Sequence, residues 1–190
     1  FWPGPLTLVL PKTAAVPDLA TAGLPTVAVR SPAHPVARAL LRELGEPLAA
    51  PSANRFGRIS PTSVADVASE LADRIGYALD GGPCSVGVES AVVAVAPDGR
   101  LTLLRPGGIA ESEIAAVAGV GLQRAETTTG AQVAPGMLAS HYAPRKPVQL
   151  LPAEVRGRVA VLAWQRLPVL PHADVVAAEG LSGSGGPSEA

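Results

Sequence analysis

Residues 51–75 read PSANRFGRISPTSVADVASELADRI and place a polar loop directly before a helical pattern. Apolar residues then recur every three or four positions, which marks one face of a helix: Val64, Val67, Ala68, Leu71 and Ile75. Ser60 suits the N-cap and Pro61 the first turn, so we expect a helix over residues 61–75. The apolar run at residues 48–50 predicts a short strand. The stretch therefore predicts a strand, a loop and a helix N-terminus, in that order.

This loop has the chemistry of an anion site. The N-terminus of a helix has unpaired N–H groups and a partial positive charge, so it suits a phosphate or a carboxylate. Ser52, Asn54 and Ser60 add neutral donors around the same point. A well-capped turn with no ligand has the same composition, because polar caps are common. The loop alone leaves both interpretations open.

Composition limits the classes of protein. The 190 residues are 47% hydrophobic and 16% charged, enough for one full domain and part of another. Only 3% are aromatic, so Ala, Val and Leu must build the core. Fifteen basic and 16 acidic residues give a net charge of −1, which argues against a strongly basic nucleic-acid surface.

Cys84 is the single cysteine, which excludes an intrachain disulfide and a cysteine-based metal site. We expect it to be an inert, buried packing residue. No apolar run reaches the roughly 18 residues of a membrane span, and no signal peptide is visible. The sequence therefore predicts a cytoplasmic protein without a membrane partner.

Strand and helix patterns alternate along the chain. Strands are expected at residues 6–10, 26–30, 77–79, 158–164 and 173–178. Helices are expected at residues 35–44, between His34 and Gly45, and at 110–117. The alternation, with one hairpin, implies an α/β fold with a mixed sheet. We expect a first α/β domain at 1–119, a linker at 120–147 and the beginning of a second, truncated α/β domain at 148–190.

The hairpin brings two polar residues together. Asp98-Gly99 lies between the apolar runs 90–96 and 100–105, which is a strong hairpin signal. A two-residue loop places Val92 opposite Arg105. Opposite residues share a face of a sheet, as do residues two apart, so Ser90 and Arg105 should lie in one site.

The candidate site is polar and weakly charged. Arg30 and Arg105 are cations at strand ends, and the nearby serines and Asn54 are neutral donors. The sequence shows no Ser-His-Asp arrangement and no acidic or histidine cluster with metal-ligand spacing. This inventory suits the anchoring of anionic groups more than covalent catalysis. Two functions fit: a nucleotide-using transferase, and a non-catalytic module that binds RNA or nucleotides.

Several short motifs occur in a specific order. They are Phe1-Trp2-Pro3-Gly4-Pro5, Thr26 to Arg30, Pro51 to Asn54, Gly87-Val88-Glu89-Ser90, Leu104-Arg105-Pro106-Gly107, Pro135-Gly136-Met137 and His141-Tyr142. At these spacings the set resembles the Sua5/YrdC/YciO family, in its two-domain Sua5 form, over about residues 1–147. The resemblance implies a YrdC-like twisted mixed sheet with flanking helices, followed by the start of a Sua5 C-terminal domain.

The resemblance also implies an activity. Sua5-type enzymes are nucleotidyltransferases that make threonylcarbamoyl-AMP from L-threonine, bicarbonate and ATP, and release pyrophosphate. Their product goes to the transferase machinery that forms threonylcarbamoyladenosine in tRNA. ATP would be a substrate, accompanied by Mg²⁺. The YrdC side of the family is associated with double-stranded RNA, which keeps the binding-module alternative open.

Site residues follow from the same resemblance. The threonine would be held by Arg30, the backbone of Ala50, and Ser90. The nucleotide would be held by Thr26, Ser52, Asn54, Ser60 and Arg105, with His141 and Tyr142 of the linker folding back over it. The resemblance leads us to assign no catalytic residue and no metal ligand.

Two features depart from the family pattern. Ala91 stands where the family usually has Thr, but strand alternation turns residue 91 away from Ser90, so we expect a mild effect. The chain starts at Phe1, and the family's Lys/Arg-containing segment lies upstream of that motif. We therefore expect this 190-residue chain by itself to make no detectable threonylcarbamoyl-AMP.

Overall fold

The computed structural model describes residues 1–125, 157–163 and 173–180. The chain divides into two compact units, Phe1–Arg145 and Lys146–Ala190, and each is described by itself.

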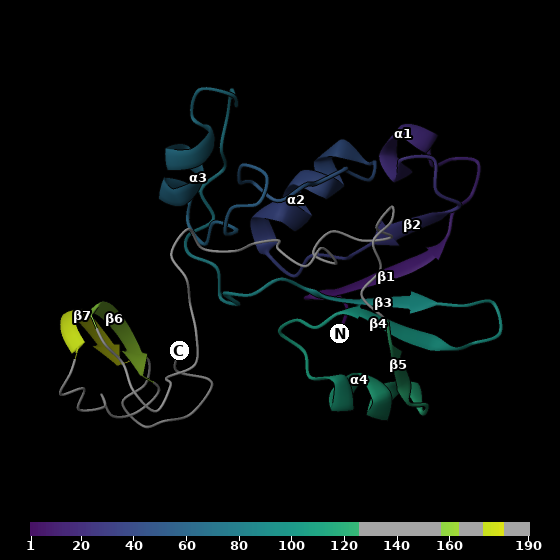
Figure 1. Ribbon diagram of the computed structural model, residues 1–190. Coiled ribbons are helices and arrows are strands. Elements are labelled where there is room, and N and C mark those ends of the chain that lie inside the picture. The colour runs from purple at the N-terminus through teal and green to yellow at the C-terminus, as the bar shows by residue number, and fades with distance from the viewer. Residues whose placement is uncertain (126–156, 164–172, 181–190) are drawn as a thin grey trace. The chain divides into compact units, whose positions relative to one another are not determined.

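A five-stranded sheet forms the centre of the first unit (Figure 1). Its strands are β1 (Leu6–Pro11), β2 (Thr26–Val29), β3 (Ala91–Val95), β4 (Leu101–Arg105) and β5 (Leu122–Arg124), in the order β2-β1-β3-β4-β5. The β1–β2 and β3–β4 pairs are antiparallel, whereas β1–β3 and β4–β5 are parallel. The predicted α/β fold with a mixed sheet is therefore confirmed. Residues 122–124, which the sequence prediction placed in the linker, add the fifth strand.

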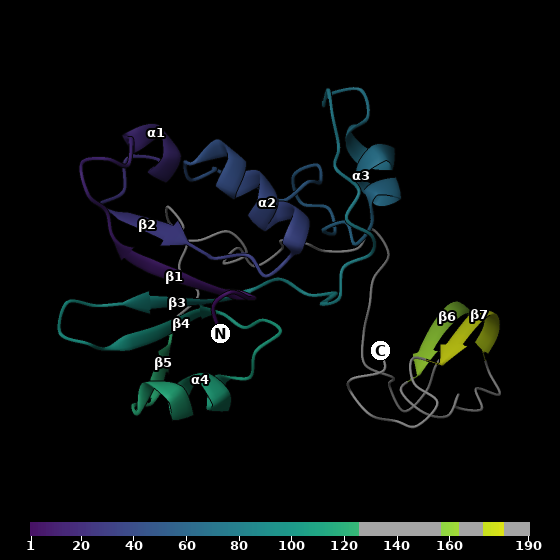
Figure 2. The same cartoon turned by 180° about the vertical axis from the view of Figure 1, so that it is seen from behind.

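Four helices accompany the sheet: α1 (Asp18–Thr21), α2 (Pro35–Leu44), α3 (Val64–Leu71) and α4 (Glu111–Ala118). In both views α1 and α2 lie near β2, and α4 lies near β5 at the other end of the sheet (Figures 1 and 2). The bounds of α2 match the prediction. His34 caps its N-terminus by accepting a hydrogen bond from the Val36 amide, and Gly45 ends it with a φ of 73°.

Apolar residues on alternate positions give the sheet two different faces. In the main core, called here the α4-side core, residues of the strands pack against α4 and the segment just before it. Its buried members are Leu6, Ala91, Val93, Leu103, Ile109 and Ile114. A smaller cluster on the opposite face contains Val9 and Val92, with Ala94 and Leu104 packed against it. Ala91 is completely buried in the α4-side core, so the prediction that residue 91 faces away from Ser90 is confirmed.

The β3–β4 hairpin has the predicted pairing at its open end, where Val92 lies opposite Arg105. The route to this register differs from the prediction. The loop has three residues, because the Ala96 amide donates to the Arg100 carbonyl, and Gly99 adopts a φ of 84°. A bulge between Val92 and Val93 then restores the pairing that a two-residue loop would have given.

The polar loop and its helix differ more from the prediction. The helix α3 is shorter than residues 61–75, and Ser63, not Ser60, is its N-cap. Ser63 and Asp66 form a reciprocal capping box. Hydrogen bonds from the Ser63 hydroxyl and the Thr62 amide lower the pKa of the Asp66 carboxyl. This cap gives α3 a defined start three residues after the predicted one.

Other expectations are wrong. Residues 48–50 and 77–79 form no strand; Pro47 and Pro51 flank the first run, and proline cannot donate to a sheet. Cys84 is exposed, not buried. Helix α2 has no buried residue, and Leu40 and Leu44 on its apolar stripe are exposed.

The second unit contains a two-stranded sheet in which β6 (Gly157–Ala163) pairs parallel to β7 (Ala173–Gly180). Both strands were predicted, at residues 158–164 and 173–178. Among the described residues, no helix has the length and apolar character needed to cross a membrane.

One glycine lets β4 leave the sheet close to the start of β3. A Cβ on Gly107 would lie 2.1 Å from the Ala91 amide nitrogen and 2.5 Å from the Glu89 carbonyl oxygen. Both atoms are backbone atoms, so neither can move without shifting the strand.

We predict that Gly107→Ala lowers the free energy of unfolding by about 1–3 kcal/mol, the usual cost of overpacking. Gly87→Ala is the matched control, because an added Cβ there meets no atom within 4 Å. Urea unfolding of the two variants measures the difference. Equal midpoints for Gly107→Ala and the parent would contradict the predicted clash.

Candidate functional site

The candidate site centres on a clasp between Arg105 and Ser90. The Arg105 Nε donates to the Ser90 carbonyl at 3.1 Å, and Nη2 donates to the same carbonyl at 2.9 Å and to the Ser90 Oγ at 3.1 Å. The Arg105 side chain is 11% exposed and Ser90 is 4% exposed. The predicted proximity of Ser90 and Arg105 is therefore confirmed.

Thr7 joins this clasp from the neighbouring strand β1. Its Oγ1 lies 2.8 Å from the Ser90 Oγ, and either hydroxyl can be the donor. When Thr7 donates, Ser90 accepts from both Thr7 and Arg105, and its own proton is left for a ligand. Thr7 and Arg105 thus prepare Ser90 to donate a hydrogen bond to an anionic group.

Glu89 connects the clasp to the polar loop. Its carboxylate accepts a hydrogen bond from the Ser60 hydroxyl through Oε1, and its Oε2 lies 3.6 Å from the Arg105 Nη2. The structure therefore brings Ser60, Ser90 and Arg105 together, although Ser60 belongs to a different segment from the hairpin.

Arg30 follows directly after β2. The printed β1–β2 pairing ends with Leu8 opposite Val29, so Arg30 lies just beyond the paired residues. Thr7 pairs with Val92, and Val92 with Arg105. If the alternation of β2 continues by one residue, Arg30 shares the face of Thr7 and Arg105, the one opposite α4. Arg30 is exposed.

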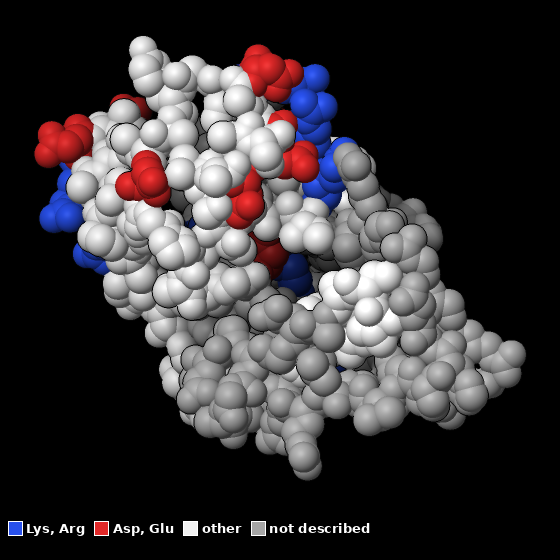
Figure 3. All heavy atoms as spheres, turned by 90° about the vertical axis from the view of Figure 1, so that its left-hand side faces the viewer, with Lys and Arg blue, Asp and Glu red and all other residues white. Residues whose placement is uncertain are grey.

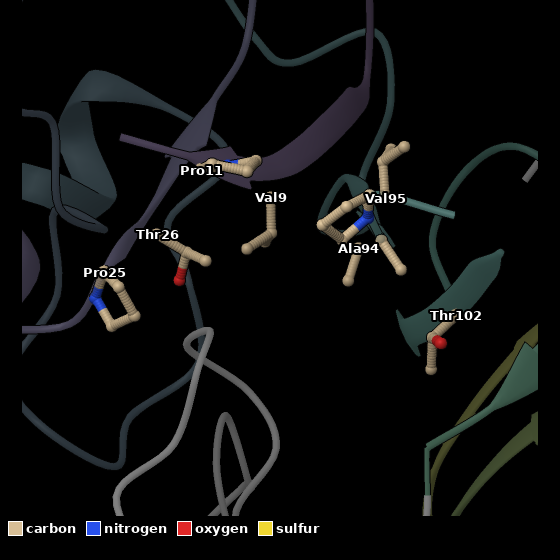
Figure 4. Close-up of a pocket in the computed structure, with 9 residues that line it drawn as sticks. Val9, Pro11, Pro25, Thr26, Ala94, Val95 and Thr102 are labelled. Carbon is tan, nitrogen blue, oxygen red and sulfur yellow. The ribbon is translucent and has the colours of Figure 1, made fainter. Parts of the chain in front are cut away.

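Thr26 lies farther along the same face. It pairs with Pro11 at the far end of β1, four residues from Arg30, or about 13 Å along the strand. There it lines an apolar hollow of about 370 Å³, together with Val9, Ala94 and Thr102 (Figure 4). The structure thus separates Thr26 from the clasp.

The remaining loop residues do not join the clasp. Asn54 donates from Nδ2 to the carbonyls of Arg55 and Arg58, at 2.9 and 3.1 Å, so its amide closes its own loop. Ser52 and Ala50 are exposed in irregular backbone. Within residues 1–125, no hydrogen bond links Asn54 or Ser52 to Ser90.

Among the described residues, the buried Asn54 Oδ1 has no hydrogen-bond partner. An amide flip would turn this oxygen toward two carbonyls, so the orientation is fixed and the acceptor stays unused.

His141 and Tyr142 lie outside the described residues. The described residues contain no group of three or more His, Cys, Asp or Glu side chains that could hold a metal ion. On the face that Figure 3 shows, acidic and basic side chains are interspersed, and neither sign forms a continuous patch.

Sequence reasoning missed two residues of the site, Thr7 and Glu89. Both stand in or beside motifs that it singled out. A signal for Glu89 was available, because a carboxylate next to a strand-end serine and opposite an arginine is well placed for an ion pair.

Two family models match successive parts of the chain. A family model for Sua5, YciO and YrdC proteins, described as Telomere recombination, matches residues 1–107. A second model, Threonylcarbamoyl-AMP synthase, C-terminal domain, matches residues 109–180.

Curated relatives agree with these matches. The threonylcarbamoyl-AMP synthases of Bacillus subtilis and Pyrococcus abyssi are 48% and 47% identical to the chain over 153 and 152 residues. These alignments cover 79% and 78% of the chain, and 44% of each relative. The chain therefore spans less than half the length of these curated relatives.

Solved structures share the fold. The crystal structure of P. abyssi Sua5 complexed with L-threonine matches with a TM-score of 0.73 and 35% identity, over 93% of this chain and 57% of that one. A P. abyssi Sua5 variant with an adjacent histidine–tyrosine pair replaced by alanines matches with a TM-score of 0.63 and 46% identity, over 71% of this chain and 41% of the variant. Because the first family model covers more than half of the 190 residues, the chain belongs to the Sua5/YciO/YrdC family.

Proposed function

We propose that the chain takes part in forming threonylcarbamoyl-AMP from L-threonine, bicarbonate and ATP, with release of pyrophosphate. The observation that carries this proposal is the cluster of donors around Ser90, Arg105 and Ser60, with Arg30 directly after strand β2 of the same sheet. Such a cluster suits a reaction whose substrates are a carboxylate, a bicarbonate and a phosphate ester. Relatives named threonylcarbamoyl-AMP synthase support it.

The threonine would bind at Arg30, the Ala50 backbone and Ser90. A guanidinium pairs bidentately with a carboxylate, and the prepared Ser90 hydroxyl can donate to the same group. That P. abyssi Sua5 has been solved with L-threonine supports an amino-acid site in this fold.

The nucleotide would lie along the same face. The proposed set is Thr26, Ser52, Asn54, Ser60 and Arg105, with His141 and Tyr142 folding over it. His141 and Tyr142 form an adjacent histidine–tyrosine pair in this chain, and such a pair was replaced in the P. abyssi variant. The described residues offer no ready-made metal cage, so Mg²⁺ would arrive with the ATP phosphates and keep most of its water ligands.

The chemistry needs charge stabilisation more than a nucleophilic side chain. The threonine nitrogen bonds to the bicarbonate carbon with loss of water, which gives a carbamate. A carbamate oxygen then attacks the α-phosphorus, and the bond to the β-phosphate oxygen breaks, which releases pyrophosphate. Arg105 would offset the negative charge that develops at the α-phosphate. The product would go on to threonylcarbamoyladenosine formation in tRNA.

The domain division 1–119, 120–147 and 148–190 and a cytoplasmic location stay part of this proposal. The alternative of an RNA-binding module is not developed further: the net charge is −1, and the described part of the face in Figure 3 carries both acidic and basic side chains.

The direct test replaces the matching part of the full-length Bacillus subtilis relative with this chain and measures pyrophosphate release from ATP and Mg²⁺ by the chimera. We expect release that requires both L-threonine and bicarbonate, whereas the 190-residue chain by itself is expected to give none. Release by the chimera without threonine, or none under any combination, would contradict the proposal.

In a full-length enzyme, such as this chimera, Arg30→Ala should mainly weaken threonine use. The loss of a charge-assisted bidentate contact costs about 2–3 kcal/mol, so the KM for threonine should rise about 30- to 150-fold with a smaller change for ATP. Arg100→Ala is the control, because Arg100 pairs with Asp98 at the hairpin turn. A weakened ATP dependence with unchanged threonine dependence would reverse the assignment of Arg30 and Arg105.

Thr7→Val should raise the KM for threonine about 3- to 10-fold, because it removes one neutral hydrogen bond to Ser90 while keeping the shape of the side chain. Steady-state kinetics on the variant measure the effect. An unchanged KM would mean that Thr7 does not orient Ser90 for a ligand.

A further inference from the structure

The Ser60 hydroxyl has one proton, and it is already in use. Ser60 donates it to the Glu89 carboxylate. A hydroxyl cannot donate the same proton to a phosphate while it holds this bond. In this arrangement Ser60 offers an incoming ligand only lone pairs, which repel a phosphate oxygen.

Glu89 also faces the cation of the site. Its Oε2 lies 3.6 Å from the Arg105 Nη2, so the same carboxylate contacts both donors that would bind an anion. A carboxylate and a phosphate oxygen have the same charge sign and the same acceptor chemistry. Glu89 therefore occupies the position that the ligand's anionic group would take.

Arg105 does not depend on Glu89 for its position. Three hydrogen bonds to Ser90 fix its guanidinium, and these leave the Glu89 carboxylate as an additional, longer contact. The Glu89 side chain is 31% exposed, against 11% for Arg105, so it can rotate into solvent. Its backbone stays in place, because Gly108 donates to the Glu89 carbonyl and Gly107 packs against it.

We propose that Glu89 is an internal competitor for the anionic ligand, which must displace its carboxylate from Ser60 and Arg105 in order to bind. The identity of the ligand as a nucleotide phosphate rests on the proposed function, but the competition itself needs only an anion. While the site is empty, the Glu89 carboxylate occupies the Ser60 hydroxyl and balances the charge of Arg105. It thereby limits the affinity of the site for phosphate groups, pyrophosphate included.

The test is calorimetric titration of the full chain and of Glu89→Gln with pyrophosphate, and separately with ATP. Glutamine keeps the size of the side chain and removes its charge. We expect the variant to bind pyrophosphate about 3- to 10-fold more tightly at low salt, because a like charge beside the ligand is removed. The gain should shrink in 0.5 M salt, since ions screen a charge effect but not a change of shape.

Glu70→Gln is the matched control. Glu70 is also a partly exposed carboxylate, 25% exposed, and lies 3.4 Å from the Arg58 Nη1. It is not in contact with Ser60 or Arg105, so its substitution should leave pyrophosphate binding unchanged. Glu89→Ala provides a second variant, and it should also bind more tightly than the parent if the carboxylate is a competitor.

Weaker or unchanged binding by both Glu89 variants would overturn the proposal, since Glu89 would then support the donors and not compete for them. The absence of measurable pyrophosphate binding in the parent and both variants would overturn it too. If pyrophosphate binding tightens while the chimera shows no threonine-dependent pyrophosphate release, the proposed function fails and the competition stands.

Discussion

The clasp of Arg105 on Ser90 is the interaction on which the rest of the site depends. One guanidinium holds the carbonyl and the hydroxyl of a single residue, so the end of β4 is fixed against the start of β3. A buried cation is costly unless it is paired, and this one has the Ser90 oxygens and the Glu89 carboxylate around it. The contact therefore serves both the hairpin and the site.

The clasp requires the backbone just after β4 to lie very close to the backbone at the start of β3. Gly107 follows Arg105 by two residues and lies against the backbone of residues 89–91, where no side chain fits. Ala91 is completely buried in the apolar core beside α4, where its small apolar side chain suits the packing. Ser90 is left to face the other side.

The sequence predicts those parts of the fold and the site that depend on residues close together in the chain. Helix α2 has a cap at His34 and a stop at Gly45, and its bounds were correct. The pairing of Val92 with Arg105 was also correct, although a three-residue loop and a bulge replaced the expected turn. Ser60 was misassigned as a cap because Pro61 suits a first turn, while the Ser63–Asp66 spacing marked the true one. Contacts such as Ser60 with Glu89 join residues 29 apart and leave no local pattern.

The two faces of the sheet have different roles: one holds most of the apolar core, and the other carries the candidate ligand site. Alternation along β1 and β3 sends one set of side chains toward α4 and the other to the face that carries Thr7 and Ser90. The α4 face buries the larger apolar cluster, whereas among the described residues the opposite face buries the apolar Val9 and Val92 together with the polar Ser90. Because neighbouring residues of a strand serve different faces, a ligand site of this kind can change its donors without changing its core.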